Sequence, residues 1–214
     1  MSAAREAILG RVRSALADVT PTPEPVVPPV TSALTGAEEA HVLDVFVERV
    51  VDYKAVVERV SAADLPAHLE GLFAPGQKVL VPTGLPVELA AALPVPVTED
   101  EGLLSAAELD GCDAVVTLSA VGIAETGTIV LDHTAGQGRR ALSLVPDRHV
   151  CVVRTDQVVP DVPEAVARLA GAVGAGQPLT WISGPSATSD IELDRVEGVH
   201  GPRTLHVLLV DGEA

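Results

Sequence analysis

Residues 113–154 decide the fold, and they read DAVVTLSAVGIAETGTIVLDHTAGQGRRALSLVPDRHVCVVR. The stretch contains three runs rich in Val, Ile and Thr: 114–118, 128–132 and 149–154. Gly, Pro or polar residues bound each run, a pattern that is typical of buried β-strands. The polar turn Glu125-Thr126-Gly127 is expected to join the first two strands, and a glycine-rich loop leads toward the third.

Polar side chains that are able to do chemistry gather in the connections between these runs. They are Glu125, Thr126, Thr128, Asp132, His133, Arg139 and Arg140. Loops held by a rigid sheet are where binding groups usually lie. The functional site is therefore expected in this stretch.

The chain on both sides of this stretch alternates between helical and strand-like patterns. Helices are expected at 38–50, 62–73, 85–93 and 163–173, and strands at 54–60, 78–82, 94–97, 179–183 and 204–210. Strands that alternate with helices predict a mostly parallel sheet covered on both faces, which is a three-layer α/β fold.

The first 31 residues are expected to form an N-terminal arm, and residues 32–214 the α/β domain. Between Ser2 and Ala17, apolar residues recur at helical spacing. Residues 20–31, TPTPEPVVPPVT, favour an extended, semi-rigid spacer. Two interpretations stay open for the arm: a tail folded onto its own domain, or a device that reaches a neighbouring subunit or a partner.

Composition excludes several classes of function. The net charge is −16 and aromatic residues make up 2% of the chain, which argues against nucleic-acid binding and against anionic membranes. The sequence has no apolar run long enough to span a membrane and no signal peptide, so a cytoplasmic protein is expected. Cys112 and Cys151 have no CxxC partner and are interpreted as buried structural thiols. No cofactor is expected.

Four segments carry a resemblance to a known family: ILGRVRSAL (8–16), AVGIAETGTIVL (120–131), GRRALSLVPDRHVCVV (138–153) and DIELDRVEGVHGPR (190–203). Together they resemble the LUD domain of the lactate-utilisation protein C (LutC/YkgG) family. The resemblance implies the fold group of ribose-5-phosphate isomerase, glucosamine-6-phosphate deaminase and the CoA transferases. It also implies an accessory subunit for the oxidation of L-lactate to pyruvate, with iron–sulfur proteins as partners. This chain lacks the cysteine spacing to hold such a cluster itself.

Glu125 is the candidate catalytic residue. CoA transferases of the implied fold group use a glutamate as the acyl-accepting nucleophile, and Glu125 is the analogue here. Gly127 permits close backbone approach, so the turn amides and the hydroxyls of Thr126 and Thr128 are candidates for an anion cradle. The alternative is that Glu125 only orders the turn through hydrogen bonds.

Arg139 and Arg140 are candidate ligand-binding residues because a guanidinium grips a carboxylate or phosphate with two hydrogen bonds. Either one instead pairs with a surface acid under the simpler interpretation. Asp132 and His133 are not expected to form a catalytic dyad, because adjacent strand residues point to opposite faces. No metal site is predicted, since no second His or Cys stands at ligand spacing from His133.

The segment 183–203 offers the remaining candidates. Residues 183–188 read as a strand-to-helix turn, which is a usual place for an anion, and Ser189 to Glu192 match a capping box that opens a short helix. His200 and Arg203, in the motif HGPR, are candidates to close over the same pocket. A rigid, proline-fixed turn is the alternative.

These patterns leave three hypotheses. The first is an accessory subunit of a lactate-utilisation system that binds a small anionic ligand or docks its iron–sulfur partners. The second is a free-standing CoA- or acyl-transferase-like enzyme with Glu125 as nucleophile, and the third is a ligand-binding module without chemistry. Homo-oligomer formation is compatible with each of them.

Overall fold

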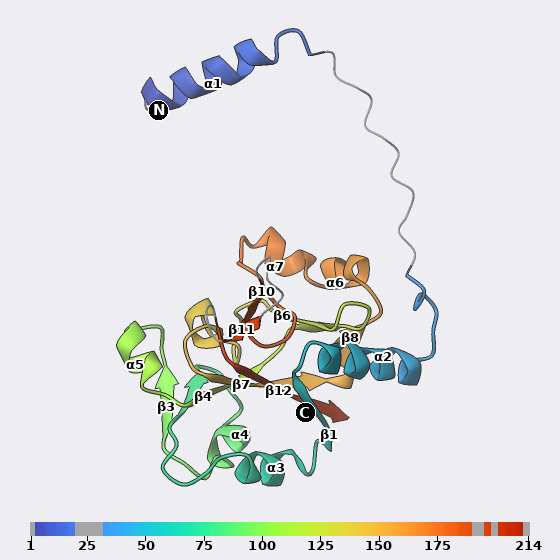
Figure 1. The fold of residues 1–214 in the computed structure, drawn as a ribbon, viewed down its shortest axis with the longest axis vertical. Coiled ribbons are helices and arrows are strands. Elements are labelled where there is room, and N and C mark those ends of the chain that lie inside the picture. Colours follow the sequence, from blue (N-terminus) through green and yellow to red (C-terminus); the bar gives the residue numbers. More distant parts are fainter. Residues whose placement is uncertain (1–2, 20–31, 190–194, 198–200, 212–214) are drawn as a thin grey trace. The chain divides into compact units, whose positions relative to one another are not determined.

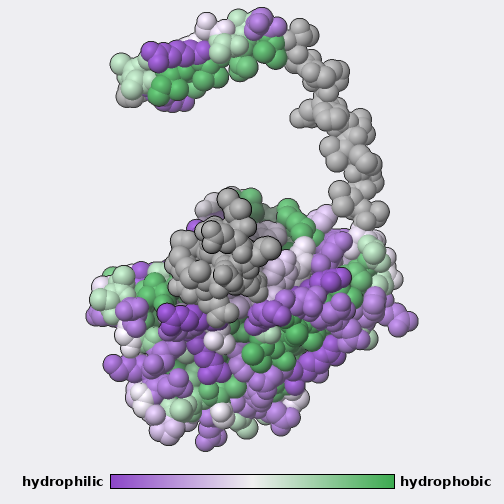
Figure 2. Space-filling view, in the orientation of Figure 1, coloured by the Kyte–Doolittle hydropathy of each residue, from purple (hydrophilic) through white to green (hydrophobic). Residues whose placement is uncertain are grey.

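The computed structural model describes residues 3–19, 32–189, 195–197 and 201–211. Contacts divide the chain into two units, 1–30 and 31–214. In the first unit the predicted helix is present as α1 (Ala3–Ala15). Its residue Ile8 is 62% exposed, and in Figure 2 the apolar side chains of α1 gather along one side of the helix. The proline-rich spacer lies outside the described residues.

A six-stranded sheet forms the centre of the second unit (Figure 1). Its strands, in spatial order, are β1 (Val56–Ser61), β12 (Thr204–Asp211), β7 (Arg148–Arg154), β4 (Ala114–Leu118), β2 (Val79–Pro82) and β3 (Val97–Asp100). Every pairing in this sheet is parallel. The predicted α/β class with a mostly parallel sheet is therefore confirmed, although β3 begins three residues later than the predicted strand 94–97.

A second sheet of four short strands corrects the expected path of the chain. Its order is β8 (Val158–Val159), β5 (Val121–Ile123), β6 (Thr128–Leu131) and β9 (Thr180–Ile182). The turn at 125–127 joins β5 to β6, so it does not connect the runs 114–118 and 128–132 directly. Those two runs belong to different sheets, because the chain leaves the first sheet after Leu118 and pairs β5 antiparallel with β6.

Short helices cover the sheets. They are α2 (Glu39–Asp52), α3 (Leu65–Gly71), α4 (Val87–Ala91), α5 (Ala106–Asp110), α6 (Val162–Arg168), α7 (Ala170–Gly174) and two 3-10 turns, η1 (Arg140–Ser143) and η2 (Thr155–Gln157). The expected helix 163–173 is divided between α6 and α7. Helix α5 was not predicted, although Ser105 and Glu108 form a complete capping box at its start. No helix in the described part of the chain is long and apolar enough to cross a membrane.

Aliphatic side chains on both faces of the central sheet form the core. Alternate residues of β12 point to opposite faces, so Leu208 packs in the cluster that includes α3 and α4, whereas Val207 packs in the cluster that includes α2. Figure 1 shows α3 and α4 on one side of the sheet and α2 on the other. Burial on both faces explains why these strands read as continuous apolar runs.

The segment after residue 186 forms a hairpin where a helix was expected. Strands β10 (Ala187–Ser189) and β11 (Arg195–Glu197) pair antiparallel, with Ser189 opposite Arg195. Ser189 therefore lies in a strand. Thr188 and Val196 are β-branched residues, which favour a strand. The rest of the predicted capping box lies outside the described residues.

Candidate functional site

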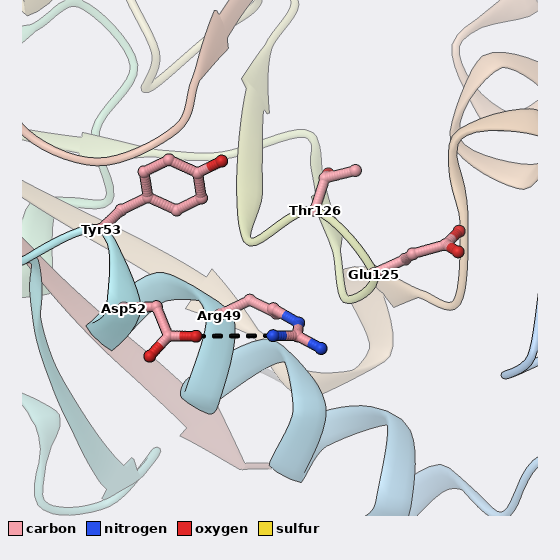
Figure 3. Close-up of a pocket in the computed structure, with 5 residues that line it drawn as sticks. All are labelled: Arg49, Asp52, Tyr53, Glu125 and Thr126. Atoms are coloured by element: carbon pink, nitrogen blue, oxygen red, sulfur yellow. Dashed lines mark hydrogen bonds and ion pairs between the residues drawn. The ribbon is translucent and has the colours of Figure 1, made fainter. Parts of the chain in front are cut away.

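The turn between β5 and β6 borders a hollow of about 430 Å³, which is drawn in Figure 3. Its lining residues are Arg49, Asp52, Tyr53, Glu125 and Thr126. Glu125 is exposed, and its carboxylate is directed away from Arg49. The Arg49 guanidinium lies 3.5 Å from Asp52 instead. Two carboxylates against one guanidinium make this hollow unfavourable for an anion.

Gly127 allows this turn to pack closely against the end of α2. Its φ is +58°, and a Cβ atom there would lie 2.7 Å from the Arg49 carbonyl carbon, so only glycine lets the turn approach the end of α2. Two amides of the expected anion cradle are also occupied: Glu125 donates to the Pro160 carbonyl at 3.0 Å, and Gly127 donates to the Ala124 carbonyl at 3.3 Å. The close approach predicted for Gly127 is therefore to helix α2.

The threonine hydroxyls of the turn lead to a different part of the domain. Thr126 Oγ1 lies 2.8 Å from Thr128 Oγ1, which lies 2.8 Å from Ser183 Oγ. Thr128 is 4% exposed, so its hydroxyl depends on these partners. This chain of hydroxyls connects the predicted turn motif to the end of β9.

Arg139 borders a second hollow, of about 580 Å³, with Asp100 and Glu101. This hollow lies beyond the carboxyl ends of β2 and β3, where open α/β sheets commonly bind ligands. Arg139 Nε donates to Asp100 Oδ2 at 2.8 Å, and Nη2 donates to Oδ1 at 3.2 Å and to the Leu104 carbonyl. Burial alone would raise the pKa of Asp100, but hydrogen bonds from Arg139 and Leu104 outweigh it and lower that pKa. Arg139 thus follows the simpler interpretation, in which it pairs with an acid.

Asp132 and His133 are each engaged by other groups. Asp132 accepts hydrogen bonds from the amide and hydroxyl of Thr134, at 3.1 and 2.6 Å. His133 Nδ1 lies 2.6 Å from the Gly138 carbonyl and must donate to it, so Nε2 accepts from the Thr180 hydroxyl at 2.9 Å when the ring is neutral. The ring is held by two partners and bridges the glycine-rich loop to β9.

Arg140 borders a third hollow, of about 260 Å³. The lining residues are Arg140, Ser143, Leu144, Thr180, Trp181, Ile182, Ser183, Gly184, Pro185, Ser186, Gly201 and Pro202. Among the residues that the structure describes, this lining includes no carboxylate. Within the described part of the chain the exposed Arg140 guanidinium has no hydrogen-bond or ion-pair partner. We call this the Arg140 hollow.

The Arg140 hollow brings together motifs that are distant in the sequence. Arg140, the turn 183–186 and the Gly201-Pro202 pair of the HGPR motif all contribute to its walls. Arg203 does not line it, because its guanidinium lies 3.1 Å from Asp147 on the surface. His200 lies outside the described residues. Trp181 and Thr180 were not predicted, since an apolar strand gives no signal of a site.

The two cysteines are buried and free, as predicted. Burial raises the pKa of the Cys151 thiol to about 12, so this thiol is neutral and unreactive in the folded protein. Burial also raises the pKa of Cys112. Neither thiol takes part in the three hollows.

Known proteins resemble this chain in both sequence and fold. Residues 43–210 match the LUD domain family, and the chain belongs to that family. It is 53% identical over 189 residues to lactate utilization protein C of Deinococcus radiodurans, a match that covers 88% of this chain and 87% of the relative. It is 36% identical over 100 residues to the uncharacterized protein YkgG of Escherichia coli, covering 45% and 43% of the two chains. A crystal structure of a DUF162 family protein from D. radiodurans matches with a TM-score of 0.70 and 48% identity, over 82% of this chain and 99% of that one.

Proposed function

We propose that this protein is a cytoplasmic component of an L-lactate utilisation system that acts with iron–sulfur partner proteins, and that its Arg140 hollow holds a small carboxylate anion. The names of its relatives support the role in lactate utilisation, above all the 53% identical protein from D. radiodurans. The proposed organisation is an arm at 1–31 followed by the LUD-type domain at 32–214.

The observation that carries the ligand proposal is the unpaired guanidinium of Arg140 above a hollow without carboxylates, among the residues that the structure describes. In a chain of net charge −16, most arginines have acids nearby, and Arg49, Arg139 and Arg203 illustrate this. A planar guanidinium binds a carboxylate through two parallel hydrogen bonds. The hydroxyl of Ser183, oriented by Thr128, supplies a further group for a second oxygen of the ligand.

Trp181 provides a direct assay. It is the single tryptophan of the chain, it lines the Arg140 hollow, and it is 42% exposed. We expect L-lactate or pyruvate to change its fluorescence in a saturable way at constant ionic strength. Chloride at the same concentration serves as the reference for a general salt effect.

Two variants that each remove one positive charge separate binding in this hollow from a general effect of charge. Arg140→Ala should weaken the titration at least tenfold, because it removes the only guanidinium among the described residues that line the hollow. Arg11→Ala removes the same charge from α1 and should leave the titration unchanged. Equal curves for the wild type and Arg140→Ala, or no saturable signal with either anion, would refute binding in this hollow.

The accessory role has a separate test. Purified alone, the protein should be colourless, hold no iron–sulfur cluster and be inactive on lactate, because the chain lacks the cysteine spacing for a cluster. Co-expression with the iron–sulfur proteins of the same system should yield a complex, and removal of residues 1–30 should weaken it if the arm is an interaction device. Oxidation of lactate by the isolated chain with an artificial electron acceptor would contradict an accessory role.

A further inference from the structure

A polar cluster on the α3 face of the central sheet lies apart from the three hollows. It consists of Glu58 on β1, His68 on α3 and His206 on β12. Glu58 lies two residues before Val60 on β1, and His206 lies two residues before Leu208 on β12, so each pair points to the same face of the sheet. Val60 and Leu208 pack against α3, and the side chains of Glu58 and His206 therefore also project toward that helix. His68 reaches the cluster from the helix itself.

Both imidazoles converge on one carboxylate. His206 Nε2 lies 2.6 Å from Glu58 Oε1, and His68 Nε2 lies 2.9 Å from Glu58 Oε2. Both Nε2 atoms are buried, yet neither makes a hydrogen bond of acceptable geometry. Buried ring nitrogens normally have such a partner. Glu58 is close enough to attract both rings, but the angles are unsuitable for hydrogen bonds, which leaves both nitrogens available to another partner.

We propose that Glu58, His68 and His206 form a binding site for a divalent transition-metal ion, with Zn²⁺ as the representative ion. Two imidazole nitrogens and one carboxylate oxygen are a donor set that suits zinc and its neighbours. One ligand atom from each of the three residues lies within 4.8 Å of the other two. Tetrahedral ligands at bond lengths of about 2.1 Å are about 3.4 Å apart. The Nε2 atoms of His206 and His68, now 2.6 and 2.9 Å from the Glu58 carboxylate, therefore need to move away from it by less than about 1 Å.

The site is built on rigid elements and remains open on one side. His206 is 7% exposed at its side chain and lies on an interior strand of the sheet, whereas His68 and Glu58 are 28% and 37% exposed. Three protein ligands and one accessible side leave a fourth position for water or another small ligand, as in open zinc sites.

Arg148 is the group that must respond to the metal. Its Nη2 atom lies 3.1 Å from His206 Nδ1, and since arginine only donates, the proton of the neutral ring sits on Nε2. A metal at Nε2 moves that proton to Nδ1, and the Arg148 contact has to open. Arg148 remains anchored, because Nη1 donates to the Leu72 carbonyl at 2.8 Å and the guanidinium lies 5.3 Å from the Phe73 ring centre.

His133 and the two cysteines are poor competitors for the ion. Both ring nitrogens of His133 are engaged by other groups. Cys112 and Cys151 are buried thiols whose pKa values are raised, so neither readily supplies a thiolate. The three residues of the cluster come from separate segments, and no spacing in the sequence predicts their meeting.

Isothermal titration of the tag-free full-length protein with Zn²⁺ tests the proposal. We expect one equivalent to bind and the melting temperature to rise with the metal, since the unfolded chain does not hold the three ligands together. Co²⁺ in place of Zn²⁺ should give visible absorption bands of a low-coordinate nitrogen and oxygen site.

Substitutions at the two more exposed ligands leave the interior strand β12 unchanged. Glu58→Gln and His68→Ala should each weaken Zn²⁺ binding at least tenfold while keeping the circular dichroism spectrum. His41→Ala, at an exposed histidine on α2, is the matched control and should bind as the wild type does. Absence of Zn²⁺ binding, or binding that survives both Glu58→Gln and His68→Ala, would overturn the proposal. The lactate titration at Trp181 is independent of this outcome.

Discussion

Replacing Arg139 with methionine tests whether this residue holds the structure together or contacts a ligand. Methionine keeps the length and the apolar stem but removes the charge and the donors. Asp100, its partner, has a side chain that is 1% exposed and accepts from Nε and Nη2 of Arg139. The substitution therefore leaves a buried carboxylate with the Leu104 amide as its remaining partner among these contacts.

The expected loss follows from these contacts. A hydrogen bond to a charged group contributes about 1.5–3 kcal/mol, and removing one partner of a buried pair destabilises by about 3–5 kcal/mol. The Arg139 side chain is 37% exposed, so water weakens the pair and the lower end applies. We expect the free energy of unfolding to fall by about 2–3 kcal/mol, which lowers the melting temperature by about 4–12 °C in a chain of this size.

The pH dependence of this loss is part of the prediction. The pKa of Asp100 is lowered from its ordinary value of 3.8, so the pair stabilises the folded state above that pH. The contribution of the pair to the free energy of unfolding declines as the pH falls below 3.8. It is lost once the pH has passed below the lowered pKa of Asp100 in the folded protein. The difference between wild type and Arg139→Met, measured by urea unfolding and circular dichroism, should thus be constant from about pH 5 to 8 and shrink in acid.

Arg203→Met is the control, since Arg203 pairs with Asp147 where both side chains are more than 60% exposed. Exposed pairs contribute little, so this variant should unfold almost as the wild type does. Equal, small losses for Arg139→Met and Arg203→Met would refute the structural role. So would a normal stability of Arg139→Met combined with a lost anion response at Trp181.

Three further predictions concern the predicted turn and the buried thiol. Glu125→Gln should change the melting temperature little, because Glu125 is exposed. Hydroxylamine should trap no acyl adduct on the wild-type protein, and a trapped adduct would favour the transferase hypothesis. Gly127→Ala should lower the free energy of unfolding by about 2–4 kcal/mol, through its clash with Arg49 and its φ of +58°. Gly176→Ala, with a φ of +72° and open space around it, should lose only about 1 kcal/mol, and equal losses would exclude the clash. Cys151 should resist thiol reagents at about pH 8 until the protein unfolds, which mass spectrometry of the labelled chain measures.

Strands of the central sheet could be predicted because their sequences are apolar on both faces. The run from Arg148 to Arg154 and the run from Thr204 to Asp211 have every interior residue buried, a short unbroken pattern that is typical of parallel strands. Strands of two to four residues, such as β5 and β8, carry too few residues to show a period. These two strands were therefore not predicted, whereas the predicted runs 128–132 and 179–183 correspond to β6 and β9 of the same sheet.

Candidate site residues could be recognised by type but not by their grouping. Arginines at 139 and 140 are adjacent in sequence, yet one pairs with Asp100 and the other faces a different hollow. Which acid an arginine meets depends on the tertiary fold, in this case on the end of β3. For the same reason the cluster of Glu58, His68 and His206 has no signature in the linear sequence.

The Arg140 hollow takes its walls from both sheets. Ser183 follows β9 of the four-stranded sheet, while Pro202 precedes β12 of the six-stranded sheet, and the Ser186 amide donates to the Pro202 carbonyl at 2.8 Å. An anion bound between these walls would link the two sheets of the domain. Hydrogen exchange in β9 and at the start of β12 should then slow together when the anion binds. A fragment that contains only one of the two sheets would lack half of the binding site.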